Sequence, residues 1–130
     1  MSLDVSPQLL AVAENGEVRE QDFVEAVRTS LPYAYDLIAR LAEELRSGTT
    51  EFADNQTQPP SEKERGQLLR ALSSDAIRGS LERHFDIALA FQNCHRVAAF
   101  HPDARGGETH TRFTSLRAQI LNQSPEYRDC

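Results

Sequence analysis

The sequence predicts an α+β domain that is mostly helical, with about five helices and one short β-hairpin. Apolar residues recur every three or four positions in several segments, as they do on the buried stripe of a helix. Only residues 84–101 read as β-structure, and within them residues 87–91 show the alternation of period two that is typical of a strand. A chain of 130 residues with 39% hydrophobic content can bury one modest core, so residues 1–130 are expected to form a single domain.

The first two helices are predicted from the residues at their boundaries. Ser6 can cap the first helix, Pro7 suits its first position, and Gly16 is expected to end it in the left-handed conformation. The second helix covers residues 21–29, and Pro32 should break the chain out of it.

The third helix, residues 33–46, has the strongest apolar stripe in the chain and stops before Gly48. Residues 47–60 are then expected to be a long polar loop. Phe52 is the single large apolar residue of this loop, and we expect it to anchor the loop to the domain.

Two more helices are predicted from residue 61 onward. Ser61 and Glu64 form a capping box at the start of the first one. Ser74 lies in a run of two serines and an aspartate, and serine prefers a helix cap to a helix interior. We therefore expect two helices that meet at Ser74, the second of which continues to Phe85.

A hairpin follows these helices. Alternating large and small apolar residues predict a strand over residues 87–91, and a second short apolar run predicts a strand over residues 97–100. The polar residues 92–96 are expected to form the loop between them. The order helix, turn, helix, hairpin in residues 61–101 is also that of a winged helix, in which the second helix reads DNA.

A last helix is predicted near the C-terminus. Thr109 or Thr111 can cap it, and Pro125 follows its end. Residues 122–130 are expected to be a flexible tail. The side chains expected on one apolar face of this helix are Phe113, Leu116 and Ile120.

The net charge of −6 is unevenly distributed. Residues 1–60 carry four arginines and eleven acids, a net charge of −7, whereas residues 61–130 carry ten basic and nine acidic residues, a net charge of +1. This distribution argues against nucleic-acid binding by the whole domain, because phosphate contacts need a positive face. It leaves room for a local basic face in the second half.

The sequence also indicates a compartment. Its apolar runs are far shorter than a membrane span, and its N-terminus lacks the basic start and apolar segment of a signal peptide. We therefore expect a cytoplasmic protein with no membrane association and with both cysteines reduced.

Five strings occur together along the chain: SLPYAYDLIARL, EFADNQTQPP, GQLLRALSSDAIRG, AFQNCHRVA and LNQSPEYRDC. Over nearly the whole chain they resemble a family of small cytoplasmic proteins of filamentous actinobacteria, to which no activity or catalytic residue is attached. The resemblance implies a soluble, intracellular, bacterial protein and transfers no site. It also leads us to expect an acidic helix cap where Arg19 stands, so its absence weakens the start of the second helix.

The predicted hairpin loop gathers the side chains that can carry chemistry. The positive surroundings of Cys94 favour a thiolate, so Cys94, His95 and His84 are candidate catalytic residues. Cys94, His95 and His101 are candidate metal ligands, although none of the usual zinc-ligand spacings is present. A structural cysteine beside exposed imidazoles is the better interpretation, and no cofactor is expected.

A candidate anion site is predicted from the arginines of the same region. Arg70, Ser74, Arg78 and Arg96 can converge on an anion beside a helix N-terminus, and Asn93 adds a polar side chain. The same arginines can instead form ion pairs with neighbouring acids, which is the better of the two interpretations.

Three hypotheses of function follow. The first is a non-enzymatic regulatory or protein-interaction module, with a protein partner or further copies of itself. The second is a DNA-binding regulator that uses residues 61–101. The third is a thiol- or metal-dependent sensor or small enzyme centred on Cys94.

Overall fold

The computed structural model describes residues 3–93 and 95–122. These residues form a mostly helical α+β fold, as the sequence predicts. The helices are α1 (Pro7–Asn15), α2 (Glu20–Ser30), α3 (Pro32–Ser47), α4 (Glu62–Ser73), α5 (Asp75–Phe85), the 3-10 helix η1 (Pro102–Ala104), α6 (Glu108–Phe113) and α7 (Leu116–Leu121). The strands are β1 (Phe52–Asp54), β2 (Ala88–Asn93) and β3 (Arg96–Phe100).

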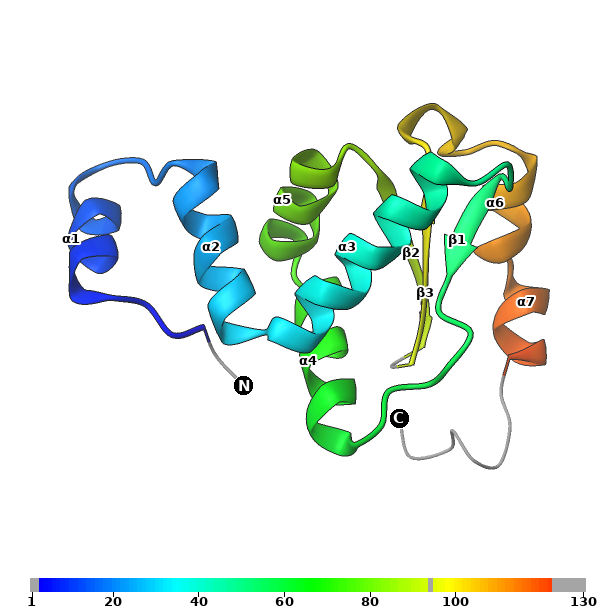
Figure 1. Cartoon of the computed structure of the whole chain (residues 1–130), viewed down its shortest axis with the longest axis horizontal. Helices are drawn as coiled ribbons and strands as arrows, with labels where there is room; N and C mark the ends of the chain where they lie inside the picture. The colour runs from blue at the N-terminus through cyan, green and yellow to red at the C-terminus, as the bar shows by residue number, and fades with distance from the viewer. Residues whose placement is uncertain (1–2, 94, 123–130) are drawn as a thin grey trace.

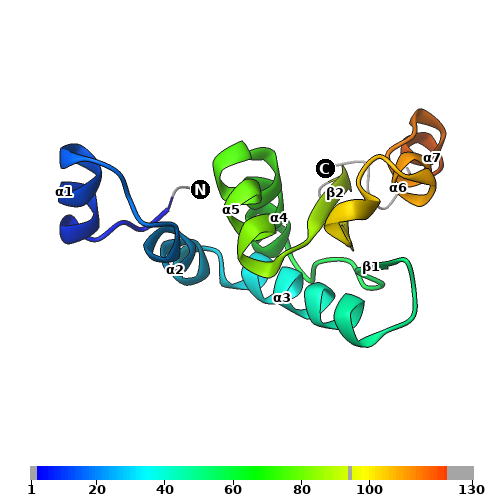
Figure 2. The same ribbon diagram turned by 90° about the horizontal axis from the view of Figure 1, so that it is seen from above.

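The three strands form one antiparallel sheet in the order β1-β3-β2. Helices α3, α4 and α5 lie on one side of the sheet, and α6 and α7 lie on the other (Figure 1; Figure 2). Helix α2 packs against α5, and α1 lies beyond α2 at one end of the molecule. None of the helices in the described part of the chain is long and apolar enough to cross a membrane.

The alternation along the strands divides the apolar side chains into two groups. Leu89, Val97 and Ala99 belong to the main core, which they share with α2, α3, α4 and α5. The residues between them face the opposite way and pack against α6. That smaller cluster contains Ala88, Ala90, Ala98, Phe100 and Phe113, with Phe52 against it.

A buried glutamine caps the start of α3. Leu31 is the N-cap of α3 and offers no side-chain acceptor. Gln67 of α4, 4% exposed, supplies one instead, because its Oε1 accepts hydrogen bonds from the amides of Tyr33 (2.7 Å) and Ala34 (3.3 Å). The first turn of α3 is thus capped by a residue of a different helix.

The N-terminal helices follow the sequence, except for the conformation of Gly16. The break at Pro32 is confirmed, and Ser6 caps α1 by accepting from the amide of Leu9 at 3.1 Å. Gly16 has φ 161°, so it is extended and not left-handed. Arg19 precedes α2 without capping it by its side chain, which instead forms an ion pair with Asp22.

The predicted capping box of α4 differs in its bonding. The Ser61 hydroxyl contacts the Glu64 carboxylate, so the two side chains bond to each other and Ser61 makes no side-chain bond to the helix amides. Ser74 does separate α4 from α5, and its Oγ accepts from the amide of Ile77 at 3.3 Å. The helix α5 then ends at Asp86, which takes the left-handed conformation with φ 56°.

The predicted polar loop 47–60 contains a strand. Phe52 pairs with Phe100 across β1 and β3, and the two rings stack with centroids 5.2 Å apart. Phe52 therefore anchors this segment as part of the sheet. The hairpin loop is also shorter than predicted, because Asn93 and Arg96 already pair as strand residues.

The last predicted helix is two helices. Thr114 and Ser115 interrupt it, and Ser115 caps α7 by accepting from the amide of Ala118 at 3.1 Å. Phe113 stays buried against the sheet, whereas Leu116 and Ile120 become exposed. The predicted common apolar face is therefore wrong. The predicted tail lies outside the described residues, except for Asn122.

Candidate functional site

A polar cavity of about 180 Å³ lies where the hairpin end meets the segment after β1. Four side chains of the segment after Ala53 and two of the hairpin form most of its wall. The lining residues are Asp54, Asn55, Gln56, Gln58, His95, Arg96 and Asn122. His95 and Arg96, which the sequence singled out, both line this cavity.

The charge of Arg96 is already compensated in this cavity. Its guanidinium donates to Asp54 Oδ2 from both Nη2 (2.7 Å) and Nε (3.2 Å), and the Asp54 side chain is only 10% exposed. The Arg96 Cζ atom also lies 5.5 Å from the centre of the Phe113 ring. Arg96 therefore joins β3 to β1 and α6, and a bound anion would compete with Asp54 for it.

Asn55 continues the pairing between β1 and β3. The amide of Val97 donates to Asn55 Oδ1 at 2.9 Å, and the Asn55 side-chain amide donates to the carbonyl oxygen of His95. The backbone amide of Asn55 donates to Val97 O at 3.3 Å. A single side chain therefore fixes the start of β3 against the segment that follows β1.

His95 is buried at the turn of the hairpin, with 4% of its surface exposed. Burial lowers the pKa of its imidazole, and the positive charges of Arg65 and Arg96 lower it further. The ring is consequently neutral at neutral pH. The sequence predicted exposed imidazoles, and for His95, which lies in the turn between β2 and β3, that expectation is wrong.

The structure does not bring His84 or His101 to His95. His84, at the end of α5, lies against Phe85 and Tyr35, and His101 precedes η1. Both flank the end of the hairpin where Ala88 pairs with Phe100, whereas His95 is beyond the pair Asn93 and Arg96. The strands between these ends separate the histidines by roughly 16 Å, at about 3.3 Å per residue.

The predicted anion site is likewise divided. Ser74 and Arg78 meet at the junction of α4 and α5, where Arg78 donates to Leu72 O (3.0 Å) and pairs with Asp75. Arg96 lies on the α6 side of the sheet, because it alternates with Val97 and has its guanidinium over the Phe113 ring. Arg70 is half-buried on α4. The four residues do not converge.

The remaining predicted site residues are on the hairpin. Asn93 lies at the end of β2, and its Oδ1 accepts from the amide of His95 at 3.2 Å. Cys94 lies outside the described residues, so its proposed catalytic and metal-binding roles stay predictions. Within residues 3–93 and 95–122, no group of three metal-ligating side chains occurs.

Sequence reasoning missed Asp54 and Asn55, which complete the cavity. They stand in a segment that the sequence assigned to a loop, so nothing placed them opposite Arg96 and Val97. The only local sign of a strand was the run FAD, which consists of an apolar residue, a small residue and an acid. Three residues are too few to show a period of two.

A second, more apolar groove of about 370 Å³ lies between the sheet and the helices α6 and α7. Phe52, Phe113, Ala118 and Leu121 contribute its apolar part, and three arginines line it as well: Arg96, Arg112 and Arg117. Arg96 and Arg112 are paired with Asp54 and Glu108, whereas Arg117 forms no ion pair with any described residue. This groove offers apolar contacts beside positive charge.

The fold and the two grooves define a small helical α+β protein. Most of the polar side chains described above bond to other parts of the same fold. The chain belongs to the family described as NucS shadow ORF, which it matches over residues 1–130. That description names no organism, so the actinobacterial part of the resemblance stays a prediction. No curated protein and no solved structure matches the chain.

Proposed function

We propose that the protein is a non-enzymatic, cytoplasmic module with a regulatory role, which acts by binding another protein surface through α7 and the adjoining groove. The exposed apolar face of α7 carries this proposal. Leu116, Ile120 and Leu121 are 84%, 71% and 65% exposed, and α7 has no buried residue. Such a cluster beside an apolar groove is typical of a protein-interaction site.

The engagement of the reactive side chains supports a binding role over catalysis. His84 packs on aromatic rings, His95 is buried, and Arg78 and Arg96 are held by Asp75 and Asp54. Each of these groups contributes to holding two elements together. A catalytic group, in contrast, needs to reach a substrate from a shared cleft.

The second candidate function is nucleic-acid binding by α4, α5 and the hairpin, and the order of these elements favours it. The packing of α5 argues against this function, because α2 covers part of α5 and Arg83 pairs with Glu20 of α2 at 2.8 Å. The turn between α4 and α5 contains Ser74 followed by an acid. An acid in this turn disfavours contact with a phosphate backbone.

The first test is whether the polypeptide accumulates in cells, because a shadow reading frame lies across another coding sequence. Targeted mass spectrometry should detect its tryptic peptides. The control is a strain in which the start codon of this frame is removed by a change that is synonymous in NucS. Absence of the peptides while NucS is translated would overturn the proposal.

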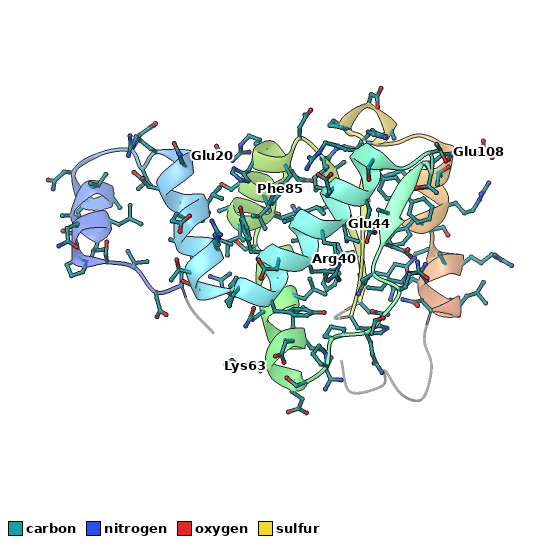
Figure 3. The ribbon with its side chains drawn as sticks, in the orientation of Figure 1. Glu20, Arg40, Glu44, Lys63, Phe85 and Glu108 are labelled. Atoms are coloured by element: carbon teal, nitrogen blue, oxygen red, sulfur yellow. The ribbon has the colours of Figure 1, made fainter. Side chains whose placement is uncertain are left out.

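The second test locates the interaction site. Leu121→p-benzoylphenylalanine places a photoreactive group on α7, and Lys63→p-benzoylphenylalanine places it on an exposed residue of α4 (Figure 3). Irradiation should link position 121, and not position 63, to a discrete protein. Equal linking from both positions, or from neither, would contradict the proposal. Salt-sensitive retention of duplex DNA would favour the second candidate.

A further inference from the structure

The two ends of the molecule both carry a helix that contributes nothing to the core. Helix α1 has no buried residue, and neither has α7. They lie at opposite ends of the long axis (Figure 1). Isolated helices shorter than about 12 residues are marginal in water, so helices of nine and six residues need a surface to pack on.

The end formed by α1 and α2 has a groove of about 460 Å³. Leu9 and Val12 of α1 and Ala26 of α2 give it apolar contacts, and Val12 is 47% exposed. Its acidic residues are Asp4, Asp22 and Glu25, of which Asp22 pairs with Arg19 and Glu25 with Arg28. Residues 3–31 carry six acids and two arginines, a net charge of −4.

The end formed by α6 and α7 has the complementary properties. Its apolar side chains project from the surface, with Leu116, Ile120 and Leu121 among the most exposed large apolar residues of the described chain. Residues 96–122 carry four arginines and two acids, a net charge of +2, and two of these arginines, Arg96 and Arg105, pair with Asp54 and Glu82 outside this range. Arg117, on α7 itself, has no ion-pair partner among the residues described.

We propose that the occupant of the α1–α2 groove is a second copy of this chain, which inserts its own α7. The proposal rests on the proposed function and names the partner of the same surface. Leu116 and Ile120 fill the apolar floor, and Arg117 faces the acids of the groove. Opposite charge at the two ends aligns the copies and disfavours contact between like ends.

This contact is head to tail, so a pair of copies in contact keeps one free groove and one free α7. A heterologous contact of this kind forms rings where the rotation closes and open filaments where it does not. Assembly therefore does not stop at a dimer unless a ring closes. Salt weakens it, since the charges involved are exposed.

Sedimentation velocity of the full chain, from low micromolar to millimolar concentration, tests this geometry. The weight-average mass is expected to rise beyond that of a dimer and to fall at high salt. Ile120→Glu disrupts the inserted helix α7, and Val12→Glu disrupts the groove that receives it. Each variant alone should raise the dissociation constant roughly tenfold or more, because a charge is placed in a desolvated apolar contact.

An equimolar mixture of the two variants gives the decisive result. The intact groove of Ile120→Glu accepts the intact α7 of Val12→Glu, so the mixture forms a dimer and nothing larger. Lys63→Glu, a charge reversal on the exposed start of α4 and outside both surfaces, should assemble as the parent does. Circular dichroism of each variant checks that the fold is kept.

Two outcomes would overturn the proposal. The first is a monomer at every concentration. The second is loss of assembly in Ile120→Glu with parent-like assembly in Val12→Glu, which indicates a symmetric contact between two α7 helices. A monomeric chain that is still photo-linked from position 121 to another protein rejects self-assembly and leaves the proposed function standing.

Discussion

At the scale of single residues, Gln67 connects two helices that are distant in sequence. Its Oε1 serves the amides of Tyr33 and Ala34 at the start of α3, and it is 4% exposed. Gln67→Leu keeps the volume and leaves both amides without an acceptor. We expect a loss of about 1–3 kcal/mol in the free energy of unfolding, measured by urea denaturation.

The matched control for this variant is Gln21→Leu, at an exposed position of α2. It makes the same chemical change and should alter the free energy of unfolding by less than about 0.5 kcal/mol. Equal effects of the two variants would show that the capping bonds of Gln67 contribute no stability of their own.

His95 gives the fold a dependence on pH. Its pKa is lowered in the folded state by burial and by Arg65 and Arg96, so the unfolded chain binds more protons just below the ordinary pKa of about 6.5. The contribution of the neutral ring to stability is complete above that pH and is lost progressively as the pH falls below it. The free energy of unfolding should therefore decrease from pH 7.5 toward pH 5 by more in the parent than in His95→Gln.

Urea denaturation at a series of pH values measures this difference. Parallel curves for the parent and for His95→Gln would contradict the assigned origin of the pH dependence. A curve for the parent that rises on acidification would reverse the direction of the shift and reject it as well.

At the scale of elements, Asn55 holds β1 to the start of β3. Its Oδ1 accepts from the amide of Val97, and its side-chain amide donates to His95 O. Asn55→Ala leaves the Val97 amide without this acceptor, so we expect faster hydrogen exchange at Val97 and a loss of about 1–3 kcal/mol in unfolding free energy. Thr57→Ala, at an exposed position of the same segment, is the control and should change neither measurement.

The elements that the sequence predicted well are those whose signals are local. Ser74 caps a helix whose amide lies three residues away, and Pro32 breaks a helix at its own position. Gln67 and Asn55 act on partners 33 to 42 positions distant, and only the tertiary fold brings them together. A polar residue in a loop or on a helix shows nothing of such a partner in the sequence.

The candidate site was predicted less well for the same reason. His95 and Arg96 are neighbours in the chain and both line the polar cavity, but their side chains have different surroundings. One is buried toward α4, and the other pairs with Asp54 beside Phe113. The sequence suggested that both would meet further site residues, whereas His84 and Arg78 lie on α5, away from the cavity.

At the scale of the whole molecule, stability is concentrated between α2 and the sheet. Leu41 of α3 is 1% exposed in the main core, whereas Leu10 of α1 is 52% exposed. Leu10→Pro should break α1 and leave the unfolding free energy of the monomer within about 0.5 kcal/mol of the parent, because α1 buries no side chain. Leu41→Ala should lower it by about 2–5 kcal/mol.

The comparison is made by urea denaturation at a concentration low enough for the chain to be monomeric. At high concentration Leu10→Pro should lose the additional stability that assembly gives the parent, because the groove between α1 and α2 is disrupted. A large loss for Leu10→Pro in the dilute monomer would instead make α1 a part of the folded core. The apolar side chains of α1 would then already be packed within their own chain and would not be available to a second copy.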